Sequence, residues 1–167
     1  MNRPKIRGKI LTVISAEWTS QSQNIHKSAF WVYVFLTNYH KNPISLIDYE
    51  LEADFGEGYI KLERVYGDVS KVLPPVITAK DNMNVDIQLK NLRQHLLYKN
   101  AKPVRYGEFN HGFVMFAGDD LSLYSRKALK IKFVCIDVFG NRHVICTQYD
   151  QLASFHFLQE ILDVDHS

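Results

Sequence analysis

The sequence has little cysteine, no long hydrophobic run and almost no net charge. Its only two cysteines, Cys135 and Cys146, exclude a disulfide-rich scaffold, and their spacing is not that of a zinc site. No stretch approaches the ~18 apolar residues of a membrane-spanning helix, and the apolar run at residues 10–14 is too short for a secretory signal. A net charge of +2 does not by itself indicate a polyanionic partner. With Met1 taken as the natural start, we expect a cytoplasmic protein without membrane insertion.

Motifs for common catalytic and cofactor sites are absent as well. The sequence contains no glycine-rich phosphate loop, no Gly-x-Ser-x-Gly elbow and no dinucleotide-binding fingerprint. Its seven histidines are scattered, without the His-x-His or His-Glu-x-x-His spacing of a metal site. We therefore expect no cofactor, no metal and no catalytic residue.

The composition that remains is that of an ordinary globular domain. A chain of 167 residues fits one domain, and an apolar fraction of 46% with a charged fraction of 23% excludes a disordered chain. The aromatic fraction of 13% suits sheet surfaces, on which broad rings pack well.

Residues 128–147 carry the strongest structural signal, two β-strands folded about a Gly140-Asn141 turn. Apolar residues occupy both faces near this turn, so we expect the hairpin to lie deep in the fold. Counting outward from a two-residue turn places Cys135 opposite Cys146, with Cα atoms ~5.5 Å apart. A disulfide is compatible with that distance, whereas a reducing cytosol favours two small buried thiols.

Further strands follow from apolar and β-branched residues. Residues 29–38 are apolar on both faces, as in a central strand covered on both sides, whereas residues 44–55 alternate between apolar and acidic positions. A short crossover helix is predicted at residues 91–100 and an amphipathic helix at residues 149–163. The other strands are expected at residues 6–18, 59–66, 84–90 and 113–117.

About eight strands joined by short connections predict an all-β fold, an immunoglobulin-like antiparallel β-sandwich. We expect the sandwich to span residues 1–148, with the helix and tail at residues 149–167 packed on it or on a partner. Four segments are informative: Val-Tyr-Val-Phe-Leu-Thr-Asn at 32–38, Ile-Asp-Tyr-Glu-Leu at 47–51, Gly-Phe-Val-Met-Phe at 112–116 and Asp-Val-Phe-Gly-Asn at 137–141. They resemble an uncharacterised group of bacterial immunoglobulin-like sandwich domains. The resemblance implies a fold and no activity.

Two charged rows invite a functional interpretation. Asp48, Glu50, Glu52 and Asp54 share one strand face at ~6.6–7 Å spacing, which is compatible with acids in glycoside hydrolysis. A solvated outer face that prevents edge-to-edge pairing is the favoured interpretation. The basic row of Arg3, Lys5, Arg7 and Lys9 also lies on one side of an extended strand. It predicts either a phosphate-binding stripe or the same protection of an edge.

The segment at residues 104–112 mixes a cation, aromatics and an acid at one end of the predicted sandwich, where such folds commonly bind ligands. Its candidate binding residues are Arg105, Tyr106, Glu108 and His111. The alternative is a packed turn, in which Gly107 and Gly112 supply unusual backbone angles.

The predicted C-terminal helix must bury an apolar face. Either this face caps the sandwich, or it packs against a second copy or another protein. The residues of that face are Leu152, Phe155, Leu158, Ile161 and Leu162. The favoured function is a non-enzymatic interaction module with a protein partner or self-association. The alternative is a nucleic-acid or anionic-ligand binder that uses the basic row.

Overall fold

The computed structural model describes residues 6–20, 25–65, 76–81, 86–90, 95–97 and 102–153. In these residues the chain forms antiparallel β-sheet and no α-helix, which confirms the all-β prediction. The strands are β1 (Ile6–Ser20), β2 (Ile25–Asn38), β3 (Leu46–Asp54), β4 (Tyr59–Arg64), β5 (Val76–Lys80), β6 (Asp86–Lys90), β7 (Phe109–Gly118), β8 (Lys130–Asp137) and β9 (Arg142–Gln148). Two short 3-10 turns, η4 (Leu121–Ser125) and η5 (Tyr149–Gln151), complete the described elements.

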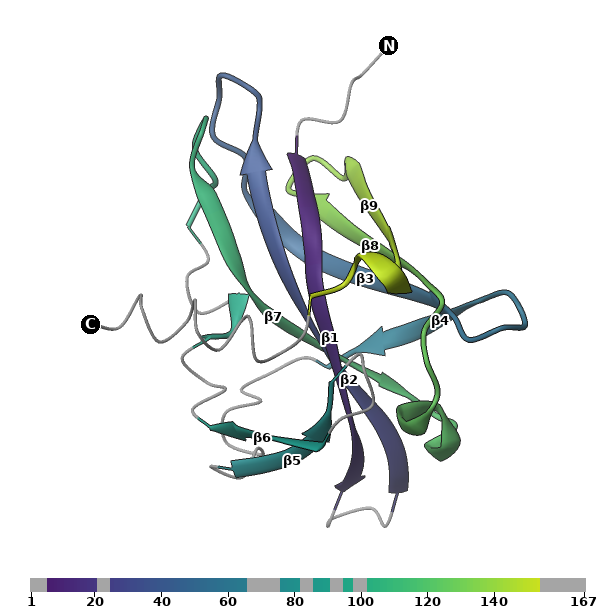
Figure 1. Cartoon of the computed structure of the whole chain (residues 1–167). Coiled ribbons are helices and arrows are strands. Elements are labelled where there is room, and N and C mark those ends of the chain that lie inside the picture. Colours follow the sequence, from purple (N-terminus) through teal and green to yellow (C-terminus); the bar gives the residue numbers. More distant parts are fainter. Residues whose placement is uncertain are drawn as a thin grey trace.

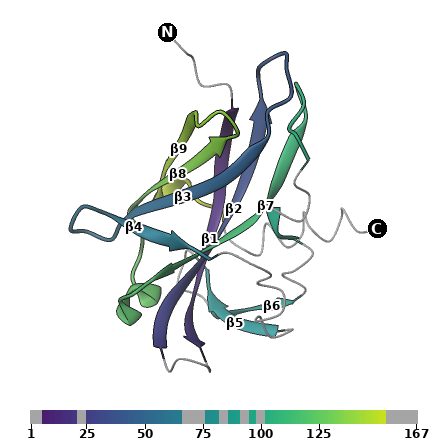
Figure 2. The ribbon, with the colours of Figure 1, turned by 180° about the vertical axis from the view of Figure 1, so that it is seen from behind.

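The strands form one continuous sheet that folds over itself into two layers. Their order is β6-β5-β1-β2-β7-β4-β3-β8-β9, and β4 pairs with both β7 and β3 at the corner between the layers. Figures 1 and 2 show β1, β2 and β7 side by side, with β3, β8 and β9 crossing them. The far edge returns to β1, where Ala153 N–H donates to Leu11 C=O at 2.7 Å. The described part of the chain therefore closes on itself.

Strand β2 is buried on both faces, as residues 29–38 predict. Its even-numbered apolar residues, such as Val32 and Val34, enter the main core between the layers. Its odd-numbered residues Trp31 and Tyr33 enter a second core on the opposite face. That second core also contains Ala79 of β5, Ile87 of β6, Leu96, and Phe113 and Met115 of β7. The β5–β6 hairpin and residues 95–97 thus cover part of the outer face of β1-β2-β7.

The β8–β9 hairpin is present, but its predicted register is wrong. A three-residue loop joins the strands: Gly140 N–H donates to Asp137 C=O at 2.9 Å, and Asp137 N–H donates to Asn141 C=O at 3.1 Å. Gly140 has a φ of 80°, as in a type I turn closed by a bulge. Cys135 therefore pairs with His143, and Cys146 with Lys132. This odd shift places the thiols on opposite faces, so Cys135 is buried, Cys146 is exposed, and neither is bridged.

Other boundaries also differ from the prediction. Strand β5 was not predicted, and β7 begins at Phe109, inside the segment expected to be a loop. Most of the predicted crossover helix lies outside the described residues, and Leu96 within it bridges to Phe113. The predicted C-terminal helix does not begin at Tyr149, because η5 ends at Gln151 and Leu152 is extended. Residues 154–167 lie outside the described part.

Among the described residues, no helix has the length and apolar character that crossing a membrane requires.

The two thiols are expected to differ in reactivity. Cys146 is exposed, whereas Cys135 is fully buried and burial raises the pKa of its thiol. Iodoacetamide should therefore add one label to the folded protein and two after unfolding in urea, as measured by intact mass. A mass lower by two hydrogens and no label under either condition would instead indicate a disulfide.

Closure of β9 onto β1 depends on Gly8. A Cβ atom at this position would lie 2.3 Å from the Phe35 carbonyl oxygen and 2.8 Å from Cδ1 of Ile145 on β9. Replacing Gly8 with Ala should lower the free energy of unfolding by about 1–3 kcal/mol, because the backbone must move to admit the methyl group. Urea denaturation measures this, and Lys9→Ala on the neighbouring exposed position serves as the control. Equal stability of Gly8→Ala and wild type would show that the closure tolerates an added side chain.

Candidate binding face and the buried clamps beside it

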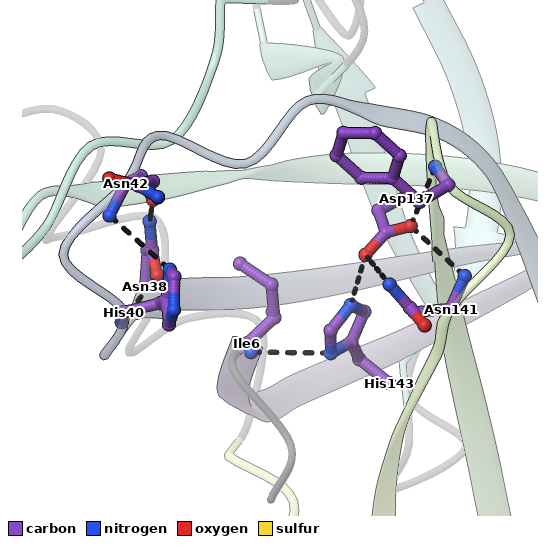
Figure 3. Close-up of polar contacts among 8 residues, drawn as sticks. Ile6, Asn38, His40, Asn42, Asp137, Asn141 and His143 are labelled. Atoms are coloured by element: carbon purple, nitrogen blue, oxygen red, sulfur yellow. Dashed lines mark hydrogen bonds and ion pairs between the residues drawn. The ribbon is translucent and has the colours of Figure 1, made fainter. Parts of the chain in front are cut away.

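A buried histidine joins β1 to the β8–β9 hairpin (Figure 3). His143 Nε2 lies 3.0 Å from Asp137 Oδ2, and Ile6 N–H donates to Nδ1 of the same ring at 3.3 Å. Because Nδ1 accepts, these hydrogen bonds place the proton on Nε2, which donates to the carboxylate. Both ring nitrogens are therefore engaged, and the imidazole has no free nitrogen for proton transfer. We interpret this arrangement as a structural clamp.

Asp137 also organises the turn of the hairpin. Its carboxylate accepts hydrogen bonds from Phe139 N–H at 2.9 Å and from Asn141 N–H at 3.0 Å, besides the Asn141 side chain at 3.1 Å. Burial raises the pKa of Asp137, but the hydrogen bonds from His143, Asn141 and Phe139 outweigh it and leave the pKa below its ordinary value. The ionised carboxylate is thus the form that the fold stabilises.

A second clamp at Asn38 holds two loops together (Figure 3). The fully buried Asn38 side chain donates to Asn42 C=O and to Val104 C=O, both at 2.8 Å, and accepts from His40 N–H at 2.7 Å. The backbone carbonyl oxygen of Asn38 accepts from Gly107 N–H at 3.1 Å. This clamp fixes the residues after β2 against the loop that leads into β7.

Next to this clamp, the outer face of β1-β2-β7 carries rings and cations in register. Arg7 on β1 pairs with Thr37 on β2, which pairs with Phe109 on β7. The next row along the same face is Lys9, Phe35 and His111. We call this surface the aromatic–basic face: Arg7, Lys9, Phe35, Tyr39, Phe109 and His111.

The rings of the aromatic–basic face are held against one another. His111 stacks on Phe35 with centroids 4.9 Å apart, and its Nδ1 lies 2.6 Å from the hydroxyl of the buried Tyr33. Phe109 contacts Phe35 edge-on at 6.3 Å yet remains 69% exposed, and Tyr39 is 58% exposed with Arg7 5.0 Å above its ring. Large exposed rings beside cations are typical of a binding surface.

The loop residues predicted to bind lie beside this face. Arg105, Tyr106 and Glu108 are exposed, and Tyr106 bridges to Asn38. His111 is not in the loop but on β7, within the aromatic–basic face. An open groove of about 220 Å³ runs from this loop onto β7. Its lining residues are Lys102, Pro103, Val104, Glu108, Phe109, Asn110 and His111.

The predicted basic row is described only in part. Arg3 and Lys5 lie outside the described residues, whereas Arg7 and Lys9 are exposed on the same face of β1. Among the residues that the structure describes, no carboxylate pairs with either cation. Sequence reasoning missed Phe35, Tyr39 and Phe109, although Phe35 follows Tyr33 on the same face of β2 and Tyr39 comes directly after that strand.

The acidic row on β3 is paired with cations from neighbouring strands. Its ion pairs are Asp48 with Arg64 (2.6 Å), Glu50 with Arg142 (2.6 Å) and Lys61 (3.5 Å), and Glu52 with Lys132 (3.4 Å). Asp54 caps the next turn by accepting from Gly56 and Gly58 N–H. An open groove of about 350 Å³ adjoins the row. Glycoside hydrolysis needs an acid of raised pKa, whereas the hydrogen bond from Arg142 lowers the pKa of Glu50.

Of the residues predicted on the C-terminal helix, the structure describes one. Leu152 is half-buried and packs against the main core. Phe155, Leu158, Ile161 and Leu162 lie outside the described residues. The described ranges contain no group of three or more metal-ligating side chains.

No protein-family model, curated protein or solved structure matches this chain.

The Asp137 carboxylate is expected to contribute stability that depends on pH. Because its pKa is lowered in the folded state, this contribution is complete above the ordinary pKa of ~3.9 and is lost as pH falls through the folded value. Asp137→Asn should therefore lower the free energy of unfolding by about 1–3 kcal/mol at neutral pH. The difference from wild type should shrink at acid pH, where the wild-type carboxyl is also neutral.

Urea denaturation across pH measures this difference. Glu57→Gln, which neutralises an exposed acid in the β3–β4 turn, is the control and should change stability by less than about 0.5 kcal/mol. A deficit in Asp137→Asn that stayed constant down to acid pH would contradict the assigned role of the charge.

Proposed function

We propose that the protein is a non-enzymatic binding module and that the aromatic–basic face is its binding surface for an anionic ligand. The observation that carries the proposal is the strand register, which aligns Arg7 and Lys9 with Phe109 and His111 across three adjacent strands. The neighbouring loop adds Lys102 and Arg105 against one acid, Glu108, so the exposed charges beside the rings are mainly positive.

An immunoglobulin-like sandwich is the scaffold that we propose for this module. The main core between two packed layers, and loops gathered at one end, support that assignment. The free thiols Cys135 and Cys146 support a reducing compartment such as the cytoplasm. Self-association through residues 149–163 remains a proposal, and the packing of Leu152 on the main core favours capping at the start of that segment.

Heparin, a generic polyanion, provides the test of the proposed surface. The wild-type protein should be retained on a heparin column and released by salt. The double variant R7A/K9A should elute at lower salt, because the ligand-facing cations have been removed. The matched control K61A/K130A also removes two positive charges, from exposed lysines on β4 and β8. These lysines lie beside the β3–β4 turn, on the other side of the molecule (Figures 1 and 2).

Elution of K61A/K130A should stay close to that of wild type. If wild type is not retained, or if both double variants shift equally, the aromatic–basic face is not an anion-binding surface.

A further inference from the structure

We infer that the ligand of the aromatic–basic face is a single-stranded nucleic acid, whose bases stack on the exposed rings while its phosphates contact the cations. This inference rests on the proposed function and specifies its ligand. It starts from the arrangement of cations and rings on separate strands. Arg7 and Lys9 lie on β1, whereas Phe109 and His111 lie on β7, two strands away.

The geometry of the sheet sets the spacing of these two tracks. Neighbouring strands lie ~4.8 Å apart, so the cation track and the ring track are separated by about 10 Å. Along each track, residues i and i+2 are ~6.8 Å apart. A single-stranded nucleic acid has the same two-sided character, with charged phosphates along one side and planar bases along the other. Sheet surfaces that bind single-stranded RNA stack bases on such rings.

Double-stranded nucleic acid fits this face less well. A duplex presents phosphates but keeps the faces of its bases stacked inside, so Phe109 and Tyr39 would have nothing to stack on. A polyanion without planar aromatic groups, such as heparin, would engage Arg7 and Lys9 through its charges alone. The exposed area of the rings thus favours a ligand that has both charges and accessible planar groups.

The rings are also preorganised for stacking. His111 is held by the Tyr33 hydroxyl at its Nδ1 and by stacking on Phe35, and Phe109 contacts the same Phe35 ring edge-on. Side chains that are already ordered lose little conformational entropy on binding. No carboxylate among the described residues pairs with Arg7 or Lys9, and the contact of Arg7 with the ring of Tyr39 leaves its positive charge uncompensated.

Fluorescence anisotropy on the full chain tests this inference with labelled oligomers of about 12 nucleotides, within the usual site sizes. The probes are oligo(dT), oligo(rU), a DNA duplex of equal length and an abasic oligomer that has the same phosphates but no bases. We expect oligo(dT) and oligo(rU) to bind about tenfold more tightly than the abasic oligomer or the duplex.

Two variants separate stacking from charge. Phe109→Ala should weaken oligo(dT) binding about tenfold and leave abasic binding unchanged, since only stacking is lost. R7A/K9A should weaken the binding of both oligo(dT) and the abasic oligomer. It should also reduce the slope of the logarithm of the binding constant against the logarithm of salt concentration by about 0.7 per lost phosphate contact. Tyr59→Ala, which removes an exposed ring at the start of β4 beside the β3–β4 turn, is the matched control and should bind as wild type.

The outcomes also separate this inference from the proposed function. Equal affinity for oligo(dT) and the abasic oligomer, or tighter binding of the duplex, would overturn the single-strand assignment while retention on heparin would leave the anion-binding face standing. If the wild-type protein bound neither heparin nor the oligonucleotides, both the single-strand assignment and the proposed function would be overturned. Phe109 is 69% exposed, so its truncation leaves both cores intact, and an unchanged urea midpoint verifies this.

Discussion

Strand β2 pairs with β1 along its whole length and with β7 over ten residue pairs, and this pairing fixes the rest of the molecule. Side chains alternate between the two faces of the strand. The even-numbered residues Val32, Val34 and Leu36 enter the main core. The odd-numbered residues Ala29, Trp31 and Tyr33 enter the second core, and Tyr39, directly after the strand, is exposed.

A single periodicity therefore produces both the second core and the candidate site. Where β5, β6 and Leu96 cover the outer face, aromatic side chains pack out of water, and burial of their area stabilises the fold. Where that cover stops, the same row continues as Phe35 and then Tyr39, with Phe109 and His111 in register on β7. The rings of the site thus extend the packing of the core to the surface, which is why they are ordered.

The sequence predicts β2 as a two-sided strand because residues 29–36 are apolar at every position. It does not predict where the cover on the outer face ends, since that cover comes from β5, β6 and Leu96, which are far away in the chain. The segment at residues 104–112 shows the same limit. The sequence predicts Arg105, Tyr106, Glu108 and His111 as candidates in a loop, but His111 and the missed Phe109 belong to β7. Only cross-strand register places these two residues in line with Arg7 and Lys9.

The acidic row on β3 and the basic row on β1 differ in their ion pairing, which the sequence of a single strand does not predict. Alternation correctly places Asp48, Glu50 and Glu52 on one face of β3, and their cations come from β4, β8 and β9. The pairs of Glu50 and Glu52 lie near the surface, where an ion pair contributes only about 0–1 kcal/mol. They mainly balance charge across the strands, whereas the Asp48–Arg64 pair is more buried. The cations of β1 have no such partners among the described residues. Pairing, rather than the sign or the spacing of the charges, distinguishes a balanced surface from one suited to a ligand.

The predicted register of the β8–β9 hairpin is wrong for a related reason. Both a Gly140-Asn141 turn and a Val138-Phe139-Gly140 loop are compatible with the residue types, and the side chain of Asp137 decides between them by binding Phe139 N–H and Asn141 N–H. That choice brings His143 beneath Ile6. It also places Val138 N–H 3.0 Å from Ser45 C=O, while Ile44 pairs with Val104 and Asn38 with Gly107. The loops at this end are thus tied to one another by hydrogen bonds, and a rigid frame of this kind would hold the adjoining rings and cations in place for the ligand that we propose.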